Sequence, residues 1–430
     1  MKRKSGRARR SIGVTLAALV LLTYFSPAMT ALREMPGALR LAVGQAATMR
    51  GGFPLALSLS GGPVAALSST DETLGGMKLT AGQKGEGSLS FSLFGLFPIK
   101  RVDVKVDDGL TLYPGGQAVG VALRTSGVLV VGLSDLSGAD GQSPARLAGV
   151  RAGDVILAVG GESVTDTQQF TRLIARSGAK PVELDVKRGE SDLRLTLTPK
   201  PVGDSGYRIG AWVRDSTAGV GTLSFYQTGQ SGQYGALGHA ITDSDTGQIL
   251  TVSQGQLMQA DIVDIKPGQR GAPGELKGSF LREGRVLGTI RQNGVFGIYG
   301  QMTDPPEHPL YPQGVPIGRK DAVHTGAATI LCTLGEEGMK EYAVEIVKCY
   351  RQDSPAPKSL VLKVTDPALL EKTGGIVQGM SGSPILQDGR LVGAVTHVYV
   401  SDPTMGYGLY IEWMLEQVAP QQAQPLDNAA

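Results

Sequence analysis

GIVQGMSGSPILQDGRLVGAV, residues 375–395, is the stretch around which this chain is organised. Glycines flank Ser381, so the backbone can take positive φ angles there and present the serine on a tight turn. Such a turn also lets neighbouring N–H groups converge where an oxyanion would form. Two apolar runs joined by an Asp-Gly turn follow, which predicts a β-hairpin. The stretch therefore predicts a displayed nucleophile, although ordinary surface loops also contain such short motifs.

The composition predicts a mainly β chain. Of 430 residues, 61 are Gly and 24 are Pro, and aromatic residues are few. The length predicts two to three domains, and the glycine and proline content favours short strands and turns. The formal net charge of +2 gives no electrostatic reason to expect a nucleic-acid partner, because a basic N-terminal tail supplies much of the positive charge.

The N-terminus predicts a membrane segment. Residues 1–10 are basic, and residues 11–32 carry no charge. As a helix, this uncharged segment would span about 33 Å, enough to cross a bilayer. The basic flank predicts that the rest of the chain is exported. We therefore expect residues 1–33 to be a basic tail with a signal anchor, which self-cleavage can later release, with a cleaved signal peptide as the alternative.

Changes of pattern divide the remainder into three domains. Residues 34–108 alternate short apolar runs with Gly-Gly pairs, which predicts a small β domain. Residues 109–203 mix helix and strand patterns. Residues 204–430 read almost entirely as strand and turn, which predicts a β-sandwich or a pair of barrels. Short helices are expected only at residues 365–372 and 410–418 of this last domain.

The middle domain contains two clear helix starts. Ser143 and Pro144 predict the N-cap and first residue of a short helix that stops at Gly149. A capping box at residues 165–168 opens a second helix, which ends at Ser177. The expected strands of this domain are residues 117–123, 128–133, 182–187 and 193–198.

This pattern resembles a PDZ domain of the bacterial protease type, most specifically over residues 144–161. The resemblance implies that a peptide adds as a strand beside residues 117–123. It also implies that backbone N–H groups of the preceding loop hold the carboxylate of the peptide. The loop residues are Tyr113, Pro114, Gly115 and Gly116. The alternative is a PDZ-shaped spacer that binds no free C-terminus.

The last domain contains strand patterns at residues 209–214, 221–226, 236–242, 249–253, 278–281 and 286–290. Residues 327–334 and 340–350 read as a hairpin, which places Cys332 opposite roughly residue 341 rather than opposite Cys349. We therefore expect both cysteines to be free and buried, with a disulfide as the minority interpretation for an exported chain.

A nucleophilic serine needs a base, and the chain has four histidines. His308 lies in a stiff polar loop and is expected to be solvated. His324 has no local signature. His397 follows the serine hairpin directly and is expected along or in the substrate cleft. His239 is flanked by small residues at a strand end, and we favour it as the base of Ser381.

The third group of a triad is less certain from the residues. Asp366 ends a strand-like run and precedes Pro367, a position that also suits a helix cap. Asp243 closely follows His239. Residue chemistry leaves both carboxylates open.

The serine segment resembles that of chymotrypsin-like proteases, in which the chain order is His, Asp, Ser. The membrane segment, the PDZ domain and the motifs around His239 and Ser381 together resemble the SpoIVB peptidases of endospore-forming bacteria over essentially the full length. The resemblance implies His239 as general base, Asp366 as orienting acid and Ser381 as nucleophile, while Ser383 is a small residue required by the turn. We expect the backbone N–H groups of Gly379 and Ser381 to be the oxyanion donors.

The same resemblance implies a role in sporulation. The protein would cross the forespore membrane into the space between two membranes. There it would cleave itself and a membrane-bound regulatory subunit, so that an intramembrane metalloprotease can process the late mother-cell sigma factor. The alternatives are a degradative quality-control PDZ protease and a non-catalytic PDZ scaffold. No cofactor or metal is expected, because no His, Cys and carboxylate cluster has ligand spacing.

Overall fold

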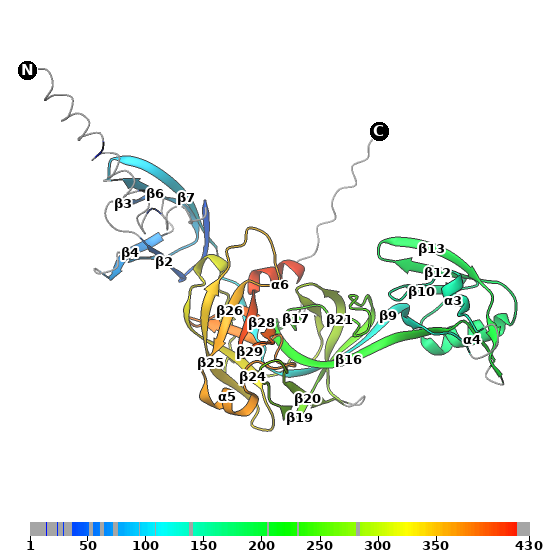
Figure 1. The fold of residues 1–430 in the computed structure, drawn as a ribbon. Helices are drawn as coiled ribbons and strands as arrows, with labels where there is room; N and C mark the ends of the chain where they lie inside the picture. Colours follow the sequence, from blue (N-terminus) through cyan, green and yellow to red (C-terminus); the bar gives the residue numbers. More distant parts are fainter. Residues whose placement is uncertain are drawn as a thin grey trace, which may run out of the picture. The chain divides into compact units, whose positions relative to one another are not determined.

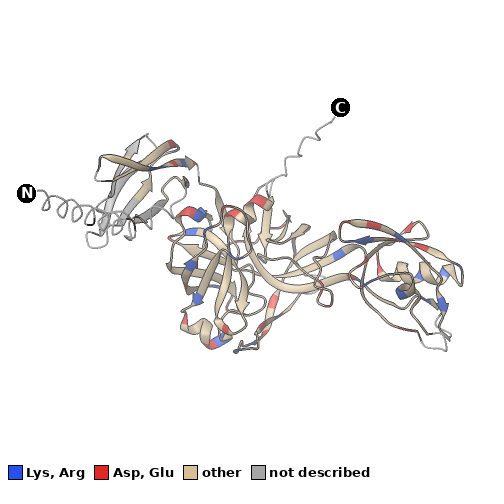
Figure 2. Cartoon of the chain, turned by 45° about the horizontal axis from the view of Figure 1, so that its top comes forward, with Lys and Arg blue, Asp and Glu red and all other residues tan. Residues whose placement is uncertain are grey.

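The computed structural model describes residues 37–418 except 51–54, 61–63, 72–75, 94, 108, 137–140, 204–205, 230–231 and 281–283, together with Val14, Tyr24 and Met29. Most of the predicted membrane segment at residues 11–32 therefore lies outside the described residues. Within the described part, no helix is long and apolar enough to span a membrane. The chain is mainly β, as predicted, and it divides into two compact units (Figure 1). Basic and acidic residues are interspersed along the described part of the chain (Figure 2).

The first unit consists of residues 1–111 together with residues 316–324. Its sheets contain, in order, β1 (Ala38–Ala42), β7 (Phe97–Asp107), β6 (Gly85–Leu93) and β3 (Leu55–Ser60), and β2 (Ala46–Arg50), β5 (Gly76–Ala81) and β4 (Val64–Asp71). Along β7, Val102, Val104 and Val106 are buried in a shared core while the intervening residues are exposed, which is the period of two that a half-buried strand requires.

Part of this first unit comes from far along the chain. The short 3₁₀ helix η2 (Lys320–Ala322) packs on β1, and Arg319 pairs with Asp107 at 2.6 Å. The sequence prediction placed residues 316–324 in the C-terminal domain. Their place in the first unit depends on contacts between residues far apart in the sequence, which a local sequence pattern cannot predict.

The second unit contains a first ring of strands. Its members are β9 (Ala118–Leu133), β18 (Val252–Gln259), β21 (Val286–Gly294), β22 (Gly297–Met302), β17 (Gln233–Ala236) and β16 (Ala211–Tyr226). β9 and β16 also pair with each other, which closes the ring into a barrel. Alternate residues such as Val119, Val121 and Leu123 fill its core. A hairpin of β19 (Asp261–Lys266) and β20 (Glu275–Ser279) extends from this barrel.

A second closed barrel follows in the chain. Its order is β24 (Gly326–Thr333), β25 (Met339–Cys349), β26 (Leu360–Val364), β29 (Asp402–Tyr410), β28 (Arg390–Tyr399) and β27 (Pro384–Gln387). The predicted helices are confirmed as α5 (Pro367–Thr373) and α6 (Ile411–Val418). The predicted hairpin is also confirmed, with Cys332 opposite Lys340 and Cys349 opposite Leu360. Both cysteines are free; Cys332 is buried and Cys349 is half-buried.

The PDZ part has the expected helices. α3 (Pro144–Leu147) is capped by the Ser143 hydroxyl, which accepts from Arg146 N at 3.1 Å. α4 (Thr167–Ser177) is capped by Asp166 and buries Phe170, Leu173 and Ile174 against the sheet. The remaining strands are β10 (Val155–Val159), β11 (Glu162–Ser163), β12 (Val182–Arg188), β13 (Ser191–Leu197), β14 (Lys200–Pro201) and β15 (Tyr207–Arg208).

Two strands run through both the PDZ part and the first barrel, which corrects the prediction. The patterns at residues 117–123 and 128–133 merge into one strand, β9, which begins at Ala118. Those at 209–214 and 221–226 merge into β16, which begins at Ala211. The polar residues between these patterns form bulges rather than ends: the β16 register shifts between Arg214 and Ser216, and Gly127 bends β9 at φ 82°. Residues 112–125 therefore belong to the barrel and not to the PDZ part.

Candidate active site

Ser381 lies on a turn that only glycine permits on either side. Gly379 and Gly382 have φ angles of 95° and 98°. A Cβ on Gly382 would lie 2.1 Å from Thr222 O and 2.6 Å from Leu237 N, and one on Gly379 would lie 2.9 Å from Leu276 Cβ. The turn is therefore pressed against the first barrel and the β19–β20 hairpin, and neither glycine can carry a side chain without strain.

Strands from both barrels hold this turn. Thr222 of β16 donates from its backbone N to Ser381 O at 3.0 Å and from its hydroxyl to Gly379 O at 2.8 Å. Gly382 N donates to Val395 O of β28 at 2.7 Å. These bonds fix the backbone on both sides of the nucleophile, so the direction of its N–H groups is set by the packing of one barrel on the other.

The backbone N–H groups of Gly379 and Ser381 are available. Across the described residues neither donates to another group, while the neighbouring N–H groups of Met380 and Ser383 are bound to Val377 O and Met380 O. Two unoccupied N–H groups beside a serine can donate hydrogen bonds to an oxyanion. The Ser381 hydroxyl likewise makes no hydrogen bond to any described residue.

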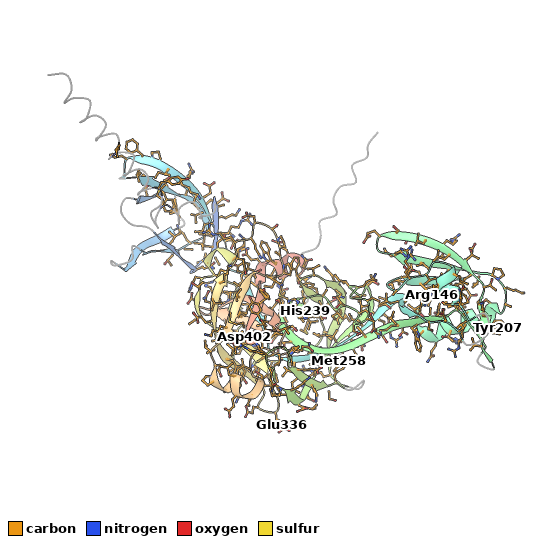
Figure 3. The ribbon with its side chains drawn as sticks, in the orientation of Figure 1. Arg146, Tyr207, His239, Met258, Glu336 and Asp402 are labelled. Carbon is orange, nitrogen blue, oxygen red and sulfur yellow. The ribbon has the colours of Figure 1, made fainter. Side chains whose placement is uncertain are left out.

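His239 follows a sharp backbone turn at the end of β17. Leu237 and Gly238 both have positive φ, at 70° and 69°. The Nδ1 atom of His239 lies 2.8 Å from the carbonyl oxygen of Ala240. Because a carbonyl oxygen can only accept, Nδ1 carries the proton and Nε2 keeps a free lone pair. Burial lowers the pKa of His239 and outweighs the opposite effect of the Ala240 carbonyl, so His239 has the tautomer and charge of a general base. Figure 3 labels His239 among the side chains of the structure.

The two barrels bring His239, Ser381 and His397 to one place. Leu237 N donates to Thr222 O, the same residue that holds the serine turn. A Cβ on Gly238 would lie 3.0 Å from Thr396 Cγ2 of β28. The rings of His239 and His397 have centroids 5.2 Å apart. Desolvation lowers the pKa of His397, and the neighbouring His239 and Lys358 lower it further, so the pair favours neutral imidazoles.

Asp366 does not join this group. It is the N-cap of α5: Oδ1 accepts from Ala368 N at 2.9 Å and Leu369 N at 3.0 Å, and Oδ2 accepts from Ala343 N at 3.2 Å. Across the described residues it makes no contact with His239. The assignment of Asp366 as orienting acid is therefore not supported, because a carboxylate directly before a helix-starting proline is used to cap that helix.

Asp243, the other candidate acid, is also committed elsewhere. Its buried side chain pairs with Arg214 of β16, and Oδ1 accepts from Asp245 N at 3.0 Å and Thr246 N at 2.9 Å. Burial alone would raise the pKa of Asp243, but these hydrogen bonds and the Arg214 charge lower it. Asp243 therefore shapes the loop that follows His239 and does not touch the imidazole.

Asn293 holds the same loop from the other side. Its Oδ1 accepts from Ile241 N at 2.8 Å, and its Nδ2 donates to Ile241 O and Leu250 O at 2.8 and 2.9 Å. Ile241 directly follows Ala240, so this clamp fixes the carbonyl that orients the histidine. Sequence reasoning missed Arg214, Thr222 and Asn293, because each acts through a partner distant in the sequence.

The predicted peptide-binding loop of the PDZ part is in a different place. Gly115 N donates to Ser224 O and Gly116 N to Leu223 O, both at 2.8 Å, and Tyr113 stacks on Tyr226. Pro114 ends strand β8 (Thr111–Pro114), which pairs with β16. Residues 118–123 are paired on one side with β16 and on the other with β18. The prediction was wrong, because the N–H groups of Gly115 and Gly116 are already bound and residues 118–123 are paired on both edges to close the barrel.

Two other histidines have no part in the site. His308 was expected to be solvated but is 5% exposed, and its Nδ1 accepts from Leu310 N and Tyr311 N at 3.2 and 2.8 Å. The two backbone N–H donors stabilise the neutral imidazole of His308 within the loop, so the ring can be buried. His324 lies in the first unit, two residues before β24.

Two β-barrels present a serine, a histidine and open N–H donors at their junction, and two strands of the first barrel continue into a PDZ part. These features define a serine endopeptidase with a PDZ module. The family comparisons agree: residues 205–415 match the SpoIVB peptidase S55 model and residues 137–188 match the PDZ domain model. Over residues 205–415 the chain is therefore a SpoIVB-like serine peptidase.

Two curated relatives resemble short parts of the chain. The serine protease HTRA1 of Xenopus tropicalis is 35% identical over 60 residues, 14% of this chain and 13% of the relative. The regulator of sigma-E protease RseP of Salmonella typhimurium is 39% identical over 64 residues, 15% of this chain and 14% of the relative. The chain thus spans about an eighth to a seventh of these relatives. The active form of the Rv3671c protease from M. tuberculosis is 14% identical with a TM-score of 0.26, covering 48% of this chain and 76% of that one.

Proposed function

We propose that Ser381 is the nucleophile of this peptidase, that His239 is its general base, and that the N–H groups of Gly379 and Ser381 bind the oxyanion. The observation that carries the proposal is the state of His239: its Nδ1 proton is bound to the Ala240 carbonyl, which leaves Nε2 free on a ring that burial keeps neutral. The unoccupied N–H groups beside Ser381 provide the complementary half of the site.

The reaction follows from this arrangement. As substrate enters, Ser381 Oγ and His239 Nε2 approach to about 2.6–3.2 Å, and Nε2 takes the hydroxyl proton while Oγ attacks the scissile carbonyl. The oxygen of that carbonyl becomes negative and is bound by the two N–H groups. The imidazolium then gives its proton to the leaving amine. A water molecule next attacks the acyl-enzyme while Nε2 takes its proton, and that proton passes to Ser381 Oγ as the acid product leaves. In this proposal the Ala240 carbonyl does the orienting that a carboxylate does in a Ser-His-Asp triad.

The biological role that we propose is intercompartmental signalling in sporulation. Exported across the forespore membrane and held there by its N-terminal segment, the peptidase cleaves itself and a membrane-bound regulatory subunit. That cleavage allows an intramembrane metalloprotease to process the late mother-cell sigma factor. The match of residues 205–415 to the SpoIVB peptidase model supports this role, as does the uncharged segment at residues 11–32.

The PDZ part would then bind a peptide at α4 rather than at residues 113–123. A shallow, open depression of about 440 Å³ lies on the surface along the first turns of this helix, lined by Thr167, Gln168, Thr171 and Arg172. Peptide segments of substrates, or of the chain itself, are the ligands that this module would take.

One experiment tests both levels of the proposal. Full-length wild type and Ser381→Ala are incubated separately with the membrane-bound regulatory subunit and with an unfolded protein such as casein, and the products are identified by N-terminal sequencing. We expect defined cuts in the chain itself and in the regulatory subunit, all absent with Ser381→Ala. Cleavage by Ser381→Ala would overturn the nucleophile assignment. Extensive cleavage of casein without a defined cut in the subunit would favour a degradative protease, and no cleavage by wild type would favour a scaffold.

A further inference from the structure

The side chain of Ile376 fills the space beside Gly406 of β29. Ile376 is 2% exposed. A Cβ on Gly406 would lie 2.5 Å from Ile376 Cδ1 and 2.8 Å from His397 O. The absence of a side chain at Gly406 therefore makes room for the end of the isoleucine, which lies against the backbone of β29 and next to the carbonyl of His397 on β28.

The backbone around Ile376 is held on both sides. Ile376 N donates to Pro403 O of β29 at 2.8 Å. Two residues further on, Gln378 N donates to Gly274 O at 2.9 Å, and Gln378 O accepts from Leu276 N of β20 at 2.8 Å. The loop that precedes the nucleophile is thus fixed between two strands, so its side chains cannot move aside as those of a flexible loop would.

The place beside Gly406 adjoins the serine turn. Gly382 N donates to Val395 O at 2.7 Å, and Val395 N donates to Ser383 O at 2.8 Å, so β28 runs directly beside this turn. Three residues further along β28, a distance of about 10 Å, Val398 is opposite Gly406. The end of β28 therefore leads from the nucleophile to the place that Ile376 fills.

The chemistry of the proposed function brings one substrate side chain to this place. The N–H groups of Gly379 and Ser381 bind the oxygen of the scissile carbonyl, and the leaving amine faces His239, which protonates it. The acyl residue, which is the substrate residue that supplies this carbonyl, must then lie on the side of Ser381 away from the leaving amine. The loop of Ile376 and the end of β28 line that side.

The segments that line this place offer no partner for a charged side chain. Residues 373–387 contain no Asp, Glu, Lys, Arg or His. In residues 395–399 the one histidine is His397, whose pKa is lowered by desolvation, so the neutral ring is favoured. Asp402, the one carboxylate of β29, accepts from Thr404 Oγ1 at 2.7 Å. A lysine, arginine or acidic acyl side chain would therefore lose its hydration without gaining an opposite charge.

We propose that Ile376 closes the acyl subsite, the place formed by Ile376, Gly406 and residues 395–398, so that this peptidase cuts after small uncharged residues such as Ala, Gly and Ser. A larger side chain would have to displace Ile376 from a loop that two strands hold in place. The inference rests on the proposed function, because it takes Ser381 as the nucleophile, and the experiment below separates the two.

The test compares graded variants of Ile376 in the full-length chain. Ile376→Val removes only the Cδ1 methyl that lies at Gly406, and Ile376→Ala removes all atoms beyond Cβ. Ile385→Val is the matched control, because Ile385 is also buried and its Cδ1 lies 2.7 Å from the position of a Cβ on Gly408. Each protein is incubated with a randomised synthetic peptide library, and mass spectrometry identifies the cuts. Ser381→Ala gives the background, and circular dichroism verifies that each variant is folded.

We expect wild type and Ile385→Val to cut at least about tenfold more often after Ala, Gly or Ser than after Leu, Phe or Lys. Ile376→Val should shift cleavage toward Leu and Met, and Ile376→Ala should shift it further, toward Phe. Three outcomes overturn the inference and leave the nucleophile standing: wild-type cuts that depend on Ser381 but follow large or charged residues, an unchanged preference in both Ile376 variants, or an equal shift in Ile385→Val. The absence of any cut by wild type above the Ser381→Ala background overturns both.

Discussion

Thr222 joins the two barrels at the nucleophile: its hydroxyl donates to the carbonyl oxygen of Gly379 at 2.8 Å, in a buried position. The same residue accepts from Leu237 N, two residues before His239. One residue of β16 thus sets the position of the serine turn relative to the histidine turn. Since β16 begins in the PDZ part at Ala211, this strand is also a direct covalent path from the PDZ core to the active site.

Replacing Thr222 by Val should impair catalysis more than binding. Valine keeps the shape of threonine but leaves Gly379 O buried without its donor, which costs about 1–3 kcal/mol. A small displacement of the oxyanion donors lowers kcat by about ten- to a hundredfold. Steady-state kinetics on a peptide substrate measures the effect, with Thr217→Val in the same strand as the control. An unchanged kcat in Thr222→Val would show that the bond does not position the turn.

Substitutions at Asp366 should separate helix capping from catalysis. Asn caps a helix about as well as Asp, so Asp366→Asn should keep kcat close to wild type, whereas Asp366→Ala should lose about 0.5–2 kcal/mol of stability. A triad acid would behave differently, since its replacement by Asn lowers kcat by about 10⁴. Turnover and chemical denaturation of both variants decide between the two roles. A large loss of kcat in a stably folded Asp366→Asn protein would restore Asp366 as a catalytic residue.

The Arg214–Asp243 pair should stabilise the loop that follows His239. In Arg214→Met, the buried Asp243 carboxylate loses its cation, and we expect a loss of about 1–3 kcal/mol, below the value for a fully buried pair because Arg214 reaches solvent. A double-mutant cycle with Asp243→Asn, followed by urea denaturation, measures the coupling. Additive effects would mean that the pair contributes nothing.

The same pair predicts a dependence of stability on acid pH. The pKa of Asp243 is lowered from 3.8 in the folded chain. Its contribution is therefore complete above pH 3.8 and decreases as the pH falls through the folded pKa. The free energy of unfolding of Asp243→Asn, measured by urea denaturation at each pH, should therefore change less with pH in this range than that of wild type. Identical pH dependence in the two proteins would contradict the assignment.

Activity should persist below the usual pKa of a histidine. Burial lowers the pKa of His239 from 6.5, so the base stays neutral and kcat/KM should begin to fall only below pH 6.5. The unfolded chain takes up this proton more readily than the folded chain, so stability also decreases as the pH falls below 6.5. Circular dichroism at each pH separates unfolding from titration of the base. An acid limb centred above pH 6.5 in folded protein would contradict a buried neutral His239.

Local patterns were sufficient for much of this protein. Glycines around Ser381, the capping residues Ser143 and Asp366, and the alternation of apolar residues in β24 and β25 each act over a few residues. The sequence therefore predicted the serine turn, the helices α3, α4, α5 and α6, and the register that separates Cys332 from Cys349. It also showed the resemblance to SpoIVB peptidases, since the motifs around His239 and Ser381 are local.

Only the tertiary structure decided what those local patterns are used for. A polar or glycine residue inside a strand pattern is equally compatible with an end or a bulge, so the length of β9 and β16 depended on whether partner strands were present to continue the pairing. Pairing with partner strands also explains why Gly115 and Gly116 lie in the barrel and not in a peptide site. Asp366 caps α5, the helix that follows it. Thr222, Arg214 and Asn293 gain their roles from partners far along the chain, and such contacts exist only after the two barrels have closed.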